Sequence, residues 1–110
     1  MEIPIINRVY DSYKFATLII FSLEKRWRYG LGLSFEQSIL DLLKFTILAK
    51  NAPRPIKKTY LLEASSHLEI ARLKLRLFLE LRLCNETKIF QLQANFQEIG
   101  RMLGGWMRSL

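Results

Sequence analysis

The sequence has few of the residues from which metal sites and catalytic centres are usually built. Its 110 residues include one cysteine and one histidine. Cys84 cannot form an intrachain disulfide, and we interpret it as a small apolar residue near a helix end in a reducing compartment. Ser65 and Ser66 precede His67, but neighbouring helical residues point apart and cannot form a nucleophile–base pair. Since no Cys/His cluster or glycine-rich phosphate loop is present either, we expect a non-enzymatic protein without metal or cofactor.

A long apolar run is also missing. The longest one, residues 15–23, is too short to span a bilayer, and no small-residue cleavage site follows it. Half of the residues are nevertheless apolar, so the chain can bury a core. These features predict one domain over residues 1–110 and a cytoplasmic location without a membrane anchor.

Acidic residues are outnumbered by basic ones. The 17 basic and 10 acidic residues give a formal net charge of +7. Such an excess suggests an anionic partner, nucleic acid first and a membrane surface second. Many small basic proteins bind no polyanion, however, so the charge must be combined with its placement along the chain.

The longest helical pattern runs from Ile56 to Leu83 and predicts a helix of roughly 40 Å. One apolar face repeats at spacings of three and four: Leu61, Ala64, Leu68, Ala71, Leu75 and Phe78. A second apolar row lies beside it: Leu62, Ile70, Leu73, Leu77 and Leu81. The apolar arc is wider than one buried face needs, which favours burial on two sides, by its own chain and by another copy.

Three further helices are expected. The first covers about Ile5 to Glu24, with a stripe of Ile6, Val9, Tyr13, Ala16 and Ile20. The second begins at a capping box, with Ser34 as cap and Gln37 reaching back, and ends near Asn51. The last is capped by Asn85 and carries the stripe Ile89, Leu92, Phe96, Ile99, Leu103, Trp106 and Leu110. Short connections between four helices predict an all-α, antiparallel up-down-up-down four-helix bundle.

Between the first two helices, Lys25 to Gly32 alternates basic and aromatic residues. We expect a loop, because Gly30 and Gly32 interrupt the helical pattern. Two interpretations stay open. The loop could contact phosphates and stack on bases, or Trp27 and Tyr29 could fold back over the end of the bundle.

The candidate nucleic-acid-binding residues follow from the bundle geometry. Arg72 and Arg76 stand one helical turn apart, and both ends of the bundle add basic residues. The full set is Lys25, Arg26, Arg28, Lys57, Lys58, Arg72, Lys74, Arg76 and Arg82. The alternative is an ordinary solvated face with Glu69–Arg72 and Arg76–Glu80 pairs.

The last predicted helix contains three glycines, each of which costs about 1 kcal/mol against alanine in a helix interior. Gly100 and Gly104 lie one turn apart and leave a flat strip next to Trp106. We interpret the strip as a close helix contact, within the chain or between subunits. The alternative is that Gly104 and Gly105 only fray the helix end.

The run from Glu98 to Ser109, with its Gly-Arg-Met-Leu-Gly-Gly-Trp core, carries a family resemblance. It resembles the C-terminal signature of the small four-helix-bundle proteins typified by the accessory variability determinant of diversity-generating retroelements. Upstream, residues 23–25, 33–43 and 61–81 extend the likeness over nearly the whole chain. Related proteins encoded by intervening sequences in bacterial ribosomal RNA genes share the bundle but match this C-terminus less well.

The resemblance implies more than the residues themselves do. Proteins of the accessory type form homopentameric barrels whose basic surface binds nucleic acid. They associate with a dedicated reverse transcriptase during mutagenic copying of a template RNA, so the expected partners are that polymerase, RNA and the cDNA copy. Two alternatives remain: an intervening-sequence type of bundle of unknown role, and a bundle that contacts only other proteins.

Overall fold

The computed structural model describes the backbone of residues 2–110 and the side chains of residues 4–110. Its helical elements are α1 (Glu2–Phe21), α2 (Lys25–Trp27), a π-helical turn (Arg28–Gly32), α3 (Leu33–Asn51), α4 (Arg54–Glu80) and α5 (Glu86–Arg108). No strand occurs in the described part of the chain. The predicted all-α class is therefore confirmed.

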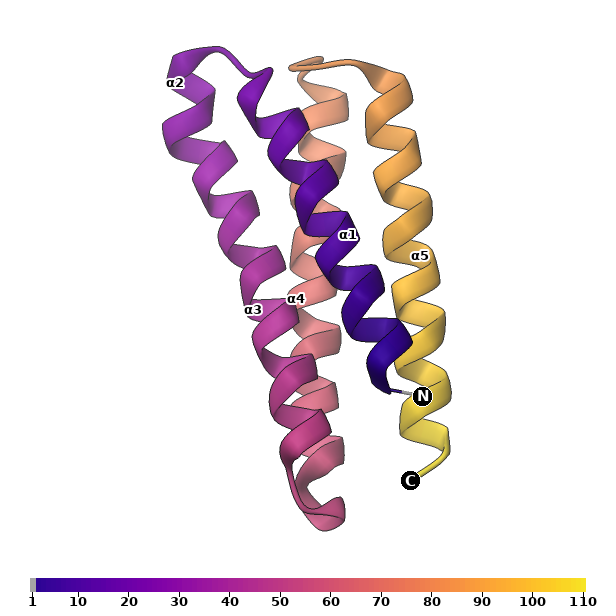
Figure 1. Cartoon of the computed structure of the whole chain (residues 1–110). Coiled ribbons are helices and arrows are strands. Elements are labelled where there is room, and N and C mark those ends of the chain that lie inside the picture. Colours follow the sequence, from indigo (N-terminus) through magenta and orange to yellow (C-terminus); the bar gives the residue numbers. More distant parts are fainter. Residues whose placement is uncertain (1) are drawn as a thin grey trace.

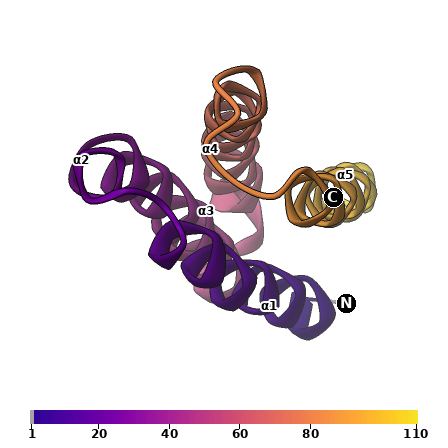
Figure 2. The ribbon, with the colours of Figure 1, turned by 90° about the horizontal axis from the view of Figure 1, so that it is seen from above.

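The four long helices run alternately up and down (Figure 1) and form an elongated bundle of 44 × 22 × 19 Å. Helix α1 packs against α3 and α5, and α4 packs against the same two helices. Viewed along the bundle, α1 and α4 therefore occupy opposite corners (Figure 2). This arrangement is the predicted up-down-up-down bundle, and it leaves both α1 and α4 with a wide outward surface.

The core is built from one face of each long helix. The six predicted inner residues of α4 are all buried, as are the first six residues of the predicted α5 stripe. Toward the end of the bundle where α3 begins and α4 ends, Phe78 and Phe96 lie edge-on to Phe35, with ring centroids 5.1 and 6.2 Å away. The stripe prediction is wrong at its last residue, Leu110, which is exposed because α5 ends at Arg108.

In α1 the buried face is rotated from the predicted one. Ile5 and Ser12 are buried, whereas Ile6 and Tyr13 are only half-buried. Tyr13 donates a hydrogen bond of 3.3 Å to Glu36 of α3. Both apolar rows of α1 are adequate core faces by periodicity, so packing against α3 and α5 decides which one turns inward.

The predicted loop at Lys25–Gly32 is wrong, because this segment is helical and continues into α3. The chain enters the helix at Glu24, whose ψ of 148° is extended. Gly32 has helical angles of −60° and −48°, so Ser34 is an interior residue and not the predicted cap. The turn that contains both glycines is π-helical, with hydrogen bonds between residues five apart in place of four, and the helix continues through it into α3.

The packing around Gly32 leaves little room for a side chain. A Cβ atom there would lie 3.2 Å from Ile20 Cγ2, 3.3 Å from Leu23 Cδ1 and 3.3 Å from the Trp27 carbonyl oxygen. The end of α1 thus packs directly on the π-helical turn. Gly30 is exposed and has no such neighbour within 4 Å.

These two glycines provide a matched pair of substitutions. Gly30→Ala is expected to raise the free energy of unfolding by about 0.5–1 kcal/mol, because alanine is the better helix former and the site is open. Gly32→Ala should lose that gain, because its Cβ meets a fixed carbonyl and two buried side chains. Urea denaturation of both variants tests the difference, and a Gly32→Ala protein as stable as Gly30→Ala would contradict the packing.

The turn between α4 and α5 is also fixed by local chemistry. Arg82 has a positive φ of 55°, and the Leu83 amide donates to the Phe78 carbonyl at 3.0 Å, as in a Schellman cap. The Asn85 side chain accepts a hydrogen bond from the Lys88 amide at 3.2 Å, which confirms Asn85 as the predicted cap. The turn sets α5 beside α4 with an open groove between them.

Candidate nucleic-acid interface

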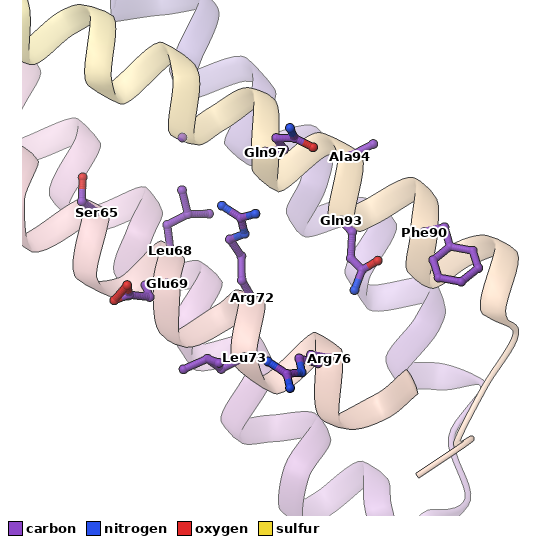
Figure 3. A pocket seen from close by; sticks show the side chains of 11 residues that line it. Ser65, Leu68, Glu69, Arg72, Leu73, Arg76, Phe90, Gln93, Ala94 and Gln97 are labelled. Carbon is purple, nitrogen blue, oxygen red and sulfur yellow. The ribbon is translucent and has the colours of Figure 1, made fainter. Parts of the chain in front are cut away.

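An open groove of about 740 Å³ lies between α4 and α5 (Figure 3). Residues from both helices line it: Ser65, Leu68, Glu69, Arg72, Leu73 and Arg76 from α4, and Phe90, Gln93, Ala94, Gln97 and Gly100 from α5. The α4 wall carries both arginines and one carboxylate, Glu69, and the α5 wall carries no charge. The groove therefore combines cations, amides and exposed apolar surface.

Small residues on α5 keep the groove open. Ala94 has only a methyl group, and Gly100 has no side chain at all. A Cβ atom at Gly100 would lie 3.5 Å from Leu68 Cδ2 and 4.0 Å from an Arg72 guanidinium nitrogen. Figure 3 shows the Arg72 side chain extending from α4 toward α5 across this space.

The two groove arginines are exposed and only partly neutralised. Arg76 Nε lies 3.2 Å from Glu80 Oε2, which confirms the predicted Arg76–Glu80 pair. Both side chains of that pair are more than half exposed, so the pair is weak. The predicted Glu69–Arg72 pair is not formed, and Arg72 has no ion pair with any side chain of residues 4–110. Its charge is available to a ligand.

Three of the nine predicted binding residues form hydrogen bonds within the chain, and their contact with nucleic acid stays a prediction. Lys57 Nζ donates to the carbonyls of Ala49 and Lys50, at 2.8 and 2.9 Å, at the end of α3. Arg28 donates in the same way to the carbonyls of Phe21 and Leu23 at 3.3 and 3.2 Å, past the end of α1.

Lys74 is the third of these. Its Nζ donates to the Ser34 carbonyl at 3.0 Å and to Ser38 Oγ at 2.8 Å, so it joins α4 to α3. In each case a cation satisfies polar groups of the helix packed beside it. The structure therefore gives Arg28, Lys57 and Lys74 a structural role.

The other predicted cations lie at the two ends of the bundle. Lys25 and Arg26 lie in α2, at the same end as Arg82, which follows α4 (Figure 1). Lys58 lies at the opposite end, in the first turns of α4. Arg26 pairs with Glu24 at 3.4 Å and lies 5.3 Å from the centre of the Trp27 ring. Trp27 itself packs against the core, whereas Tyr29 is exposed.

Sequence reasoning did not assign a second basic pocket, which lies between α1 and α5. It has a volume of about 320 Å³ and is lined by Pro4, Ile5, Arg8, Glu98, Arg101, Met102, Gly105, Trp106 and Arg108. Arg101 donates to Glu98 at 2.9 Å and holds the pKa of that carboxyl below its usual range. The spacing of Arg101 and Arg108, two helical turns apart, could have indicated a shared face.

Within the described chain, Gly104 does not make the predicted close helix contact, whereas Gly100 lies against the Leu68 side chain of α4. A Cβ atom at Gly104 would lie 3.2 Å from an Arg108 guanidinium nitrogen, and no backbone of another helix lies within 4 Å of it. The helix also does not fray there, since α5 continues to Arg108. A contact of Gly100 and Gly104 between subunits stays a prediction, whereas Trp106 is buried in the core of its own chain.

The remaining reactive side chains have structural surroundings. His67 stacks on Phe45, with ring centroids 5.2 Å apart, and lies within 4.0 Å of carboxylate oxygens of Asp41 and Glu63. Cys84 is half-buried, and burial raises the pKa of its thiol.

Within residues 4–110, no three His, Cys, Asp or Glu side chains form a group that could hold a metal ion. None of the described helices is long and apolar enough to cross a membrane.

Comparison with known protein families gives a match over most of the chain. A family model described as bAvd-like matches residues 5–110, which is nearly the whole chain. No curated protein sequence matches the chain, and no solved structure does.

Proposed function

Because the chain belongs to the bAvd-like family over residues 5–110, we propose that it is a non-enzymatic accessory subunit of a diversity-generating retroelement. In this role it binds nucleic acid and associates with a reverse transcriptase during mutagenic copying. The family match agrees with the likeness seen at Glu98–Ser109. The chain would hold template RNA or its cDNA against the polymerase and would contribute positive charge in place of catalytic groups.

One observation carries the nucleic-acid part of the proposal. Arg72 and Arg76 stand one turn apart on the wall of an open groove, and neither is buried in a salt bridge. Four further predicted cations, Lys25, Arg26, Lys58 and Arg82, are exposed at the ends of the bundle. Phosphate contacts by such side chains supply most of the affinity in nonspecific nucleic-acid binding.

In the proposed function, identical copies of the chain assemble into a ring. Two apolar rows are exposed in the described chain: Leu62, Ile70, Leu73 and Leu77 on α4 with Leu81 just after its end, and Tyr10, Leu18 and Phe21 on α1. They lie on opposite corners of the bundle, so the α4 row of one copy can pack on the α1 row of the next. Such a heterologous contact closes into a ring when the rotation permits. The number five comes from the family.

The first test is binding of a structured RNA as a function of salt. We expect the logarithm of the affinity to fall linearly with the logarithm of salt concentration, by about 0.7–0.9 per contacted phosphate. The double variant Arg72→Glu, Arg76→Glu should bind more than about tenfold more weakly near 0.1 M salt, with a shallower slope. Fluorescence anisotropy measures both quantities.

A control variant makes the same change in net charge elsewhere. Lys44→Glu, Lys50→Glu alters two exposed cations of α3, the helix diagonally opposite α5, and should reduce affinity much less. Equal losses in both double variants would show that only overall charge matters and would remove Arg72 and Arg76 from the site. If wild-type protein fails to bind RNA even at low salt, the nucleic-acid role is wrong and a bundle that contacts only proteins is favoured.

A further inference from the structure

We propose that the groove between α4 and α5 binds a single strand, with the phosphates on α4 and the bases turned toward α5. This inference rests on the proposed nucleic-acid function and specifies the form of nucleic acid that the groove accepts. It follows from how charge, amides and an aromatic ring are divided between the two walls (Figure 3).

The charge lies on one wall only. Arg72 and Arg76 belong to α4 and outnumber the one carboxylate of that wall, Glu69, whereas the groove residues of α5 are uncharged. A duplex carries phosphates on both strands and hides most of its base surface in the stack. A single strand has one line of phosphates and exposes its bases on the other side. The one-sided charge of the groove therefore matches a single strand.

The α5 wall offers what unstacked bases bind. Phe90 is 51% exposed, although a phenylalanine is usually buried when a core is available. Stacking of a base on an exposed aromatic ring raises affinity by roughly five- to a hundred-fold and tolerates any base. Phe90 therefore gives the groove a stacking surface that a duplex interior cannot use.

Gln93 and Gln97 add hydrogen-bonding groups one turn apart on the same wall. Neither amide forms a hydrogen bond with another side chain among residues 4–110. Each offers both donors and an acceptor, which suits the edges of different bases. In Figure 3 the Gln93 side chain extends from α5 toward α4 on the side of Arg76.

The dimensions agree with a short segment of a longer strand. From Ser65 to Arg76 the α4 wall is about 16 Å long, at ~1.5 Å per residue. That length covers at most about five nucleotides, at the ~3.4 Å spacing of a stacked strand, because unstacked nucleotides lie farther apart. Gly100 leaves one end without a side chain, so the strand can continue past it. An apolar helix in the groove would instead leave Arg72 and the two glutamines without polar partners.

The test compares a labelled 20-nucleotide RNA single strand with a blunt duplex of the same sequence, by fluorescence anisotropy near 0.1 M salt. We expect the single strand to bind at least tenfold more tightly. Phe90→Ala should weaken single-strand binding by at least fivefold and leave duplex binding unchanged, whereas Phe90→Tyr should keep the wild-type affinity because it keeps the ring. Circular dichroism verifies that each variant is helical.

The possible results separate this inference from the proposed function. Equal affinity for both forms, or a Phe90→Ala variant that binds the single strand as wild type does, overturns the single-strand groove while nucleic-acid binding stands. Absence of binding to either form at low salt overturns both. A duplex preference that depends on Arg72 and Arg76 would place phosphates of both strands on α4 and would also contradict the inference.

Discussion

Replacing Trp106 by alanine is expected to lower the free energy of unfolding by about 3–5 kcal/mol. The indole is only 4% exposed and ends the buried stripe of α5. Its removal leaves a cavity among residues that the four helices hold in place, so the lost contacts are not recovered by relaxation. For a domain of this size the melting temperature should fall by on the order of 15 °C. Thermal denaturation followed by circular dichroism measures the change.

The matched control is Tyr29→Ala, which removes an aromatic ring from an exposed site in the π-helical turn. This variant should stay within about 0.5 kcal/mol of wild type, because exposed side chains contribute little packing energy. Both variants must be measured at one protein concentration, since assembly adds to apparent stability. A Trp106→Ala protein with wild-type stability would show that Trp106 is not part of the core.

Ile70→Asp is expected to convert the proposed ring into single chains. Ile70 is 42% exposed in the middle of the outer apolar row of α4. If a neighbouring copy covers this row, the new carboxylate is buried without a partner, which costs several kcal/mol at every interface. Light scattering at moderate salt should then give the mass of one chain, 13.0 kDa, in place of about 65 kDa for five.

Ile47→Asp is the control for this variant, because the same residue type on α3 is 40% exposed but lies outside both apolar rows. We expect it to keep the mass of the wild-type assembly. Dissociation by both variants would mean that added negative charge, and not the α4 row, governs assembly. A wild-type protein that is monomeric at moderate salt would refute the ring directly and would leave both apolar rows without a role.

The ring and the groove share one residue. Leu73 belongs to the outer row of α4 and also lines the groove, where it lies between Arg72 and Arg76 in sequence. A neighbouring copy on the α4 row would therefore border the groove on its outer side. The two proposals are compatible, because the arginines turn toward α5 while the row faces away from the core.

Local spacing was sufficient to predict much of the fold. The inner face of α4, from Leu61 to Phe78, and the α5 stripe from Ile89 to Trp106 are buried as expected. Asn85 caps α5 as expected. The buried stripes depend on the 3.6-residue period, and the cap depends on the Asn85 side chain reaching the Lys88 amide three residues later. Both features are therefore determined within one helix. The excess of positive charge is likewise a property of the sequence.

Only the tertiary structure decided which cations are available and what lies beside them. Lys57 and Lys74 have the same charge as Arg72, yet they bind carbonyls or a hydroxyl of α3 while Arg72 faces an open groove. Lys25–Gly32 is helical and the end of α1 packs on Gly32, although the glycines of this segment by themselves predict a loop. Such outcomes depend on the rotation and offset of one helix against another, which local spacing does not specify. The same rotation sets Arg72 and Arg76 opposite Gln93 and Gln97, residues about 20 positions apart in the sequence.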